Sequence, residues 1–290
     1  MGPHVVGQRV VVRRVLPGET GPSGGPAMTD LLGLCTSWGD GVCVVQPESG
    51  APVRIALADI VSGKPVPPRP SVRHRVSPLA AQLRALTLWP DLETEQVGDW
   101  LLRRSPTERA RRANSVLAFA PAGVDDAYDR VVAHYDRPIA AVLPGSAEDE
   151  LFRRRGWVLE SHDADTQFRL ASVARVRRAL PRSGSTPVEL VETHPGVVTA
   201  SIAGVATGIA AYEQDWVGFR SIEVVPEHRR RGLGLTVMAA LLGWGAEQGA
   251  TTAYLQVLGD NRAALALYDR LGFTTHHTYR YLAPSQPPAG

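Results

Sequence analysis

The chain has few cysteines, almost no lysine and no long apolar run. Cys35 and Cys43 are its only cysteines, and Lys64 is its only lysine. It contains no stretch of 18 apolar residues and no basic-then-apolar leader, so we expect neither a membrane span nor a signal peptide. Two thiols in such a chain are expected to be reduced core residues of a cytoplasmic protein. The net charge of +2 is too small to indicate nucleic-acid binding.

The composition is that of a globular protein with more than one domain. Of its 290 residues 44% are hydrophobic and 21% charged, and this length fits two or three domains. Residues 1–65 alternate short strand-like runs with Gly- and Pro-rich turns, including a hairpin that carries both cysteines. This part resembles an SH3-like β-barrel, which either binds a peptide or nucleic acid or serves packing and dimerisation. Residues 66–76 form a proline-rich linker.

The most informative stretch is residues 222–234, IEVVPEHRRRGLG. Three of its first four residues are apolar and β-branched, and Pro226 ends this strand because proline cannot donate a ladder hydrogen bond. A turn rich in arginine and glycine follows. After it comes an amphipathic helix, with one apolar stripe made of Val237, Met238, Leu241, Leu242 and Trp244. Because a helix N-terminus offers free N–H groups and a positive dipole end, the turn predicts a phosphate site.

A second motif follows downstream. A strand-like run at residues 251–257 precedes Asp260-Asn261, the helix RAALALYDRL and Gly272-Phe273. The upstream turn has the spacing Arg229-x-x-Gly232-x-Gly234, which is neither the dinucleotide nor the P-loop pattern. Taken together, the two motifs resemble those of the GNAT (GCN5-related) N-acetyltransferases.

This resemblance implies an enzyme that uses acetyl-CoA as acyl donor and needs no metal. It implies that the donor is bound by the residues of the strand end, the turn and the later helix start: Ile222, Glu223, Val224, Arg229, Arg230, Arg231, Gly232, Leu233, Gly234, Leu235 and Asn261. Tyr268 stands at the position of the family's general acid, near the sulfur. It lies two helical turns after Asn261, so both side chains share a face, and simple packing is the alternative role for the tyrosine.

The fold class we expect is α/β (α+β), with GNAT-like mixed-sheet lobes in tandem after the barrel. Residues 97–102 and 113–120 are typical of strands. Residues 139–157 and 253–273 share the order strand, polar turn, helix, glycine and aromatic residue. We therefore predict a degenerate GNAT-like lobe without a CoA site at 77–171, a connector at 172–186 and an acetyl-CoA-binding lobe at 187–290. Ordinary strand–helix alternation is the alternative explanation. The last lobe lacks room for the helices that usually wall the acceptor site, so the preceding lobe is expected to cover that side.

The general base is less clear from the sequence. Family members place a glutamate or histidine on the strand before the turn, where this chain has Gly218 and Arg220, or in the later strand, where it has Gln256. Glu223 lies nearby on the same strand, but at a position of opposite parity to Gly218 and Arg220, so its side chain is expected to face away from them. The local candidates are Glu213 and Asp215, and a water chain or a carboxylate from the preceding lobe are the alternatives.

The resemblance also implies that the acceptor is a primary amine. The order of domains resembles a bacterial group linked to N-acetylglutamate synthase, within amino-acid metabolism, so glutamate is one candidate. Arg111, Arg112 and Arg220 would then bind its carboxylates, whereas a solvated basic turn is the other interpretation of the first two. His276 and His277 are expected to pack rather than to bind a metal or the acceptor. The rival functions are acetylation of a protein or another small amine, and a non-catalytic acyl-CoA-binding regulator. A homodimer is compatible with each.

Overall fold

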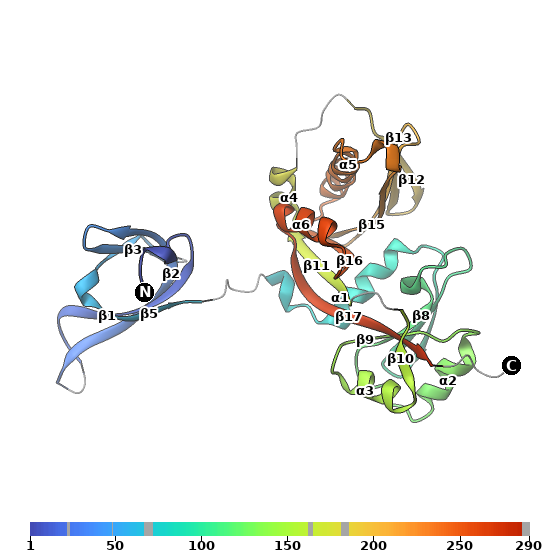
Figure 1. Ribbon diagram of the computed structural model, residues 1–290, viewed down its shortest axis with the longest axis horizontal. Helices are drawn as coiled ribbons and strands as arrows, with labels where there is room; N and C mark the ends of the chain where they lie inside the picture. Colours follow the sequence, from blue (N-terminus) through green and yellow to red (C-terminus); the bar gives the residue numbers. More distant parts are fainter. Residues whose placement is uncertain (22–23, 48, 67–71, 162–164, 181–185, 286–290) are drawn as a thin grey trace. The chain divides into compact units, whose positions relative to one another are not determined.

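A computed structural model describes residues 1–21, 24–47, 49–66, 72–161, 165–180 and 186–285. The chain divides into two compact units, Met1–Ser71 and Val72–Gly290 (Figure 1). None of the helices in the described ranges combines the length and apolarity needed to cross a bilayer. Most of the predicted linker, residues 67–71, lies outside the described residues.

The first unit is an antiparallel sheet in the order β4-β3-β2-β1-β5. Its elements are η1 (Pro3–Val5), β1 (Arg9–Thr20), β2 (Pro26–Gly39), β3 (Val42–Pro47), β4 (Val53–Ala56), η2 (Leu57–Asp59) and β5 (Ile60–Pro65). The predicted hairpin is β2 with β3. On these strands the Cys35 and Cys43 sulfurs lie 3.9 Å apart, and both thiols are free and buried in a core with Val10, Val12 and Val45.

The second unit is built on one twelve-stranded sheet that runs through two lobes. After η3 (Val72–Arg75), the first lobe holds α1 (Pro78–Arg84), η4 (Ala85–Leu88), β6 (Glu93–Val97), β7 (Trp100–Arg104), η5 (Arg111–Ala113), β8 (Ser115–Ala118), α2 (Ala127–His134), β9 (Ala140–Val142), α3 (Ala147–Arg154) and β10 (Trp157–Leu159). The remaining elements are β11 (Thr166–Ser172), α4 (Val173–Ala179), β12 (Glu189–His194), β13 (Val197–Ile202), β14 (Ala206–Glu213), β15 (Trp216–Val224), η6 (Pro226–His228), α5 (Leu233–Glu247), β16 (Thr252–Leu258), α6 (Arg262–Leu271) and β17 (Thr274–Pro284).

The two lobes repeat one arrangement of elements. The order β8-α2-β9-α3-β10 in the first lobe matches β15-α5-β16-α6-β17 in the second, and β8/β9 and β15/β16 are both parallel pairs. The prediction of GNAT-like mixed-sheet lobes in tandem is therefore confirmed. The two copies differ at the turn after the first strand of each parallel pair, because only the second copy has the arginine–glycine sequence there.

One predicted strand is wrong. Residues 97–102 were expected to form a single strand, but β6 and β7 meet in a hairpin with Val97 opposite Trp100. Gly98 turns the chain with φ +58, and a Cβ at this position would lie 1.8 Å from the Ala122 carbonyl oxygen. Glycine is therefore required here both by backbone conformation and by space.

The lobes exchange strands with one another. The strand β11, which was assigned to the first lobe, pairs with β16 on one side and β17 on the other, inside the second lobe's sheet. In return the far end of β17 pairs with β9 and β10 of the first lobe. Figure 1 shows β17 as one long strand passing from the second lobe into the first. The predicted boundary at residue 171 thus cuts through shared structure.

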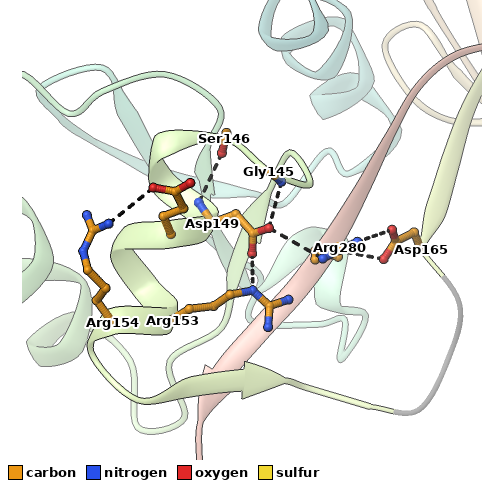
Figure 2. A network of polar contacts seen from close by, with 8 residues as sticks. Gly145, Ser146, Asp149, Arg153, Arg154, Asp165 and Arg280 are labelled. Carbon is orange, nitrogen blue, oxygen red and sulfur yellow. Dashed lines mark hydrogen bonds and ion pairs between the residues drawn. The ribbon is translucent and has the colours of Figure 1, made fainter.

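Arg280 on the exchanged strand β17 forms ion pairs with residues of both lobes. From β17 it reaches Asp165, which lies just before β11, with Nε and Nη2 at 3.1 and 2.7 Å from the two carboxylate oxygens. Its Nη1 is also 3.5 Å from Asp149 on α3. Asp149 in turn accepts hydrogen bonds from the Gly145 N–H and from Arg153 (Figure 2). One guanidinium on the exchanged strand therefore bridges elements of both lobes.

Two segments expected to be connectors are packed instead. At the end of the predicted linker, Arg73 donates to the Thr252 hydroxyl at 3.0 Å, and the His74 ring lies 3.1 Å from the Thr274 hydroxyl. In the predicted connector at 172–186, α4 buries Val173 and Val176 in the core beneath α5. Apolar spacing in α4 explains the second case, because a short helix with buried valines is a core element rather than a tether.

Candidate functional site

The site begins where two parallel strands separate. β15 and β16 are paired only from Trp216 to Phe219 and from Thr252 to Leu255, although both strands continue for several residues. On its other edge β15 carries a bulge, because its pairing with β14 skips Ser221 and Ile222. Ser221 has φ +52, a left-handed conformation that is uncommon for a residue with a side chain. The backbone groups at the bulge are therefore outside both ladders and available to a ligand.

The arginine–glycine turn leads from β15 into α5. Gly232 is the residue before the helix and has φ +80, and Arg230 has φ +64. The first intrahelical bond of α5 runs from the Thr236 N–H to the Gly232 carbonyl. The N–H groups before Thr236 therefore lack helical partners and lie at the positive end of the helix dipole. No ion pair holds Arg230 or Arg231 among the residues that the structure describes.

Two adjoining cavities occupy this end of the second lobe. The larger, an open groove of about 1500 Å³, is lined by Ile222, Glu223, Val224, Arg229 and Arg230 and by one face of α6. The smaller, about 380 Å³, is lined by nine of the twelve predicted site residues: Ile222, Val224, Arg229, Arg230, Gly232, Leu233, Gly234, Leu235 and Tyr268. Arg231 and Asn261 line neither cavity. The folded chain thus brings the strand end, the turn and α6 around one space.

Asn261 and Tyr268 have different surroundings on α6. The Asn261 side-chain oxygen accepts the Ala264 N–H at 3.1 Å and so caps the helix. Tyr268 is half-buried, with its ring edge-on to Phe273, and its hydroxyl has no hydrogen-bond partner in the described part of the chain. Burial raises the pKa of Tyr268. A protonated hydroxyl without a partner, on a residue that lines a cavity, is suited to donate a proton to a ligand.

The two local candidates for the base lie at the wrong end of β15. Glu213 is the last residue of β14, and Asp215 lies in the hairpin turn before Trp216, where it accepts a hydrogen bond from the Thr251 hydroxyl at 3.1 Å. Asp215 lies six positions before the bulge at Ser221, roughly 20 Å along the strand at 3.3 Å per residue. Neither carboxylate can reach a reacting centre at the bulge, so this prediction was wrong.

The sheet face opposite α5 is covered by the first lobe, as expected. Ala81, Ala85 and Leu88 of α1 and η4 pack on Trp216 and Tyr254 of the second lobe's sheet. The Tyr254 hydroxyl also donates to the Arg84 carbonyl at 3.2 Å. The first lobe therefore forms the wall that the second lobe cannot build for itself.

Arg220 is held by this wall. Its Nε donates to the Leu88 carbonyl at 2.8 Å, its guanidinium lies 4.3 Å from the centre of the Trp89 ring, and its Nη1 is 3.0 Å from Glu108. Glu108 comes from the loop before β8, more than 100 positions earlier in the chain. No local pattern marks it, and only the general expectation of a carboxylate from the preceding lobe pointed toward it.

The other two candidate arginines bind protein groups. Arg111 lies 2.8 Å from Glu160 and over the Tyr281 ring, and Arg112 donates to the Tyr279 hydroxyl. Both are thus parts of the lobe interface rather than a solvated turn or a ready carboxylate clamp.

His276 and His277 pack, as predicted. His277 is buried, its ring stacks on Phe168, and it is 3.1 Å from the Gln82 amide nitrogen. Burial, with a smaller contribution from His276, lowers the pKa of His277 to about 3. Among the described residues, no group of His, Cys, Asp and Glu side chains is arranged to hold a metal ion.

The strand end, the cationic glycine turn and the helix lie around one opening, as the resemblance to the GNAT N-acetyltransferases implies. Comparisons with known proteins agree. The sequence model of a family described as "Probable histone acetyltransferase Rv0428c C-terminal" matches residues 171–282. That of the "Rv0428c N-terminal Sm-like domain" matches residues 4–64, so the first unit is similar to an Sm-like domain, and an SH3-like barrel in particular gains no support.

Similar proteins extend the match over nearly the whole chain. The probable histone acetyltransferase Rv0428c of Mycobacterium tuberculosis is 28% identical over 308 residues, 97% of this chain and 96% of its own. The ribosomal protein bS18-alanine N-acetyltransferase of Escherichia coli is 40% identical over 53 residues, 18% of this chain and 36% of its own. A solved GCN5-related N-acetyltransferase from Kribbella flavida has a TM-score of 0.50 at 19% identity, covering 77% of this chain and 98% of that one. In sequence the chain is similar to a probable histone acetyltransferase over nearly its whole length, and it shares the fold of a solved GCN5-related N-acetyltransferase.

Proposed function

We propose that this protein binds acetyl-CoA between β15, the arginine–glycine turn and α6, and transfers its acetyl group to a primary amine. The observation that carries the proposal is the opening between β15 and β16 beside a bulge whose backbone groups are unpaired. The backbone of Ile222 to Val224 would hold the pantetheine arm as an extra strand. The free N–H groups of the turn and Arg229 to Arg231 would hold the pyrophosphate.

The reaction assigns a task to each group. The neutral amine attacks the thioester carbonyl carbon, the C–S bond breaks, and the CoA thiolate leaves with the bonding electron pair. Tyr268 gives this sulfur a proton, and the proton that the amine nitrogen loses as the amide forms passes to water. A free N–H at the bulge would stabilise the carbonyl oxygen while it carries negative charge.

Gly232→Glu tests the donor site. It forces a side chain into a left-handed position and adds a negative charge where phosphate is expected, so acetyl-CoA binding measured by calorimetry should be lost. Gly249→Glu is the matched control, because Gly249 at the other end of α5 has φ +100 and lies outside both cavities. Equal acetyl-CoA affinity in the two variants, at comparable thermal stability, would contradict the proposed site.

The acceptor is a protein amine or a small primary amine. The names of the relatives, a probable histone acetyltransferase and a ribosomal-protein alanine acetyltransferase, support a protein amine. Glutamate gains no such support, since Arg111, Arg112 and Arg220 are engaged by Glu160, Tyr279 and Glu108 respectively. Release of free CoA thiol, followed across a panel of amines, distinguishes a transferase from a non-catalytic acyl-CoA-binding regulator, which would bind acetyl-CoA without turnover.

A further inference from the structure

A third cavity lies between the two lobes, on the sheet face away from α5. It has a volume of about 240 Å³ and is lined from the first lobe by Trp89, Asp91 and Glu108 and from the second by His194, Ile209 and Arg220. Arg220 is the residue immediately before the bulge at Ser221. The cavity therefore reaches the reacting end of β15 from the side opposite the helix that is proposed to hold the CoA phosphates.

The charges in this cavity favour a cation. Counting His194 as neutral, it holds two carboxylates, Asp91 and Glu108, against the single guanidinium of Arg220. That guanidinium is already satisfied by Glu108, the Leu88 carbonyl and the Trp89 ring. Within the described ranges Asp91 has only weak partners, with His194 at 3.7 Å and the Thr107 hydroxyl at 3.3 Å.

One carboxylate oxygen of Glu108 is available to a ligand. Its Oε1 lies 3.0 Å from Arg220, whereas its Oε2 has no partner among the described residues. Its backbone is fixed on both sides, because its N–H donates to the Ser105 hydroxyl at 3.0 Å and its carbonyl accepts from the Asn114 amide at 2.7 Å. A carboxylate on a braced backbone, with its own side chain held by Arg220, is a preorganised partner for an ammonium group.

We propose that this cavity is the acceptor site, that it selects amines on cationic chains, and that Glu108 of the first lobe binds the incoming ammonium. The inference rests on the proposed acetyl transfer and deepens it. At about 240 Å³ the cavity is smaller than most drug-sized ligand pockets, so it admits a single side chain or chain end rather than a folded surface. The Trp89 ring and Ile209 line the path for the apolar stem of a lysine side chain.

The test uses the full chain and three acceptors: a lysine peptide with a blocked N-terminus, a lysine-free peptide with a free N-terminus, and L-glutamate. Turnover is followed by CoA thiol release, and acetyl-CoA binding by calorimetry. The wild type should prefer one of the two peptides, each of which carries a single type of cationic amine, to glutamate. Glu108→Gln, which keeps the shape of the side chain, should raise KM for the preferred peptide about tenfold or more, as expected for loss of a charged hydrogen bond. Its affinity for acetyl-CoA should not change.

Two further variants keep the result interpretable. Asp91→Asn, which does not disturb the partner of Arg220, should also raise KM for the cationic peptide. Glu93→Gln removes an exposed carboxylate of the same lobe outside the cavity and should leave KM unchanged. Preference for glutamate, or an unchanged KM in both Glu108→Gln and Asp91→Asn, overturns the inference while turnover still supports acetyl transfer. Absence of acetyl-CoA binding in the wild type overturns both proposals.

Discussion

Tyr268 is the residue on which the chemistry of the donor site depends most. Its ring is held against Phe273, so Tyr268→Phe keeps the packing and removes only the hydroxyl. We expect turnover to fall by roughly 10² to 10⁴, the usual effect of a lost general acid, with acetyl-CoA affinity unchanged. Steady-state rates and calorimetry measure the two quantities. Full activity in the variant would leave Tyr268 a packing residue only.

The same residue makes a prediction about pH. Burial raises the pKa of Tyr268 above its usual value of 10.0, so the hydroxyl stays protonated throughout the neutral range and beyond. The alkaline limb of the kcat profile that belongs to this group should therefore begin above pH 10. A limb that appears below this value and persists in Tyr268→Phe belongs to another group.

Cys43 illustrates how burial lowers the reactivity of a thiol. Burial, followed by the hydrogen bond between Cys43 and Cys35, raises the pKa of the Cys43 thiol from 9.0 to about 12. Since the thiolate is the reactive form, alkylation by iodoacetamide at pH 8 should be slow in the native protein and fast in denaturant. The stability contributed by the protonated thiol is complete below pH 9.0 and is lost as the pH rises toward 12. Rapid native alkylation would contradict this burial.

Among the elements, those with strong local signals were predictable. β15, the turn and α5 follow from an apolar strand, a proline stop and an amphipathic run, and all three form where expected. The hairpin at Gly98 was missed because an apolar residue on each side suggested continuity, although a two-residue turn with glycine is itself a hairpin signal. Strand partners were not predictable, because the period of a strand fixes which face is buried but not which strand lies beside it.

The exchanged strand β17 gives a prediction at this scale. Arg280 links β17 to Asp165 and Asp149 and is 24% exposed, whereas Arg154 pairs with Glu150 and is 67% exposed. Arg280→Ala should lower the free energy of unfolding by about 1.5 to 3 kcal/mol, the range for hydrogen bonds to charged groups. Arg154→Ala should cost less than about 1 kcal/mol, as exposed pairs usually do. Urea unfolding measures both. Equal losses would show that the bridge does not hold the exchange.

For the molecule as a whole, the donor site could be read from the sequence and the acceptor side could not. The donor residues lie within 50 positions of one another, so motif spacing reports on them directly. The acceptor cavity joins Trp89 and Glu108 to Arg220, which are brought together only when the first lobe folds over the second lobe's sheet. The absence of the usual helical wall predicted that something covers this face, but only tertiary structure identifies the covering residues.

The exchange of strands makes the two lobes one folding unit, and shortened chains test this. Every residue that lines the three cavities lies after position 71, so residues 72–290 should keep the acetyl-CoA affinity of the full chain and unfold in one transition. Residues 173–290 retain all the donor motifs but lack β11, which pairs along all seven of its residues with β16 and supplies Phe168 and Leu170 to the core. Without β11 both β16 and β17 have an unpaired edge and an open apolar face, so this shorter chain should not fold or bind acetyl-CoA. Circular dichroism and calorimetry on both chains measure the outcome. Native-like binding by residues 173–290 would mean that the second lobe is an independent domain.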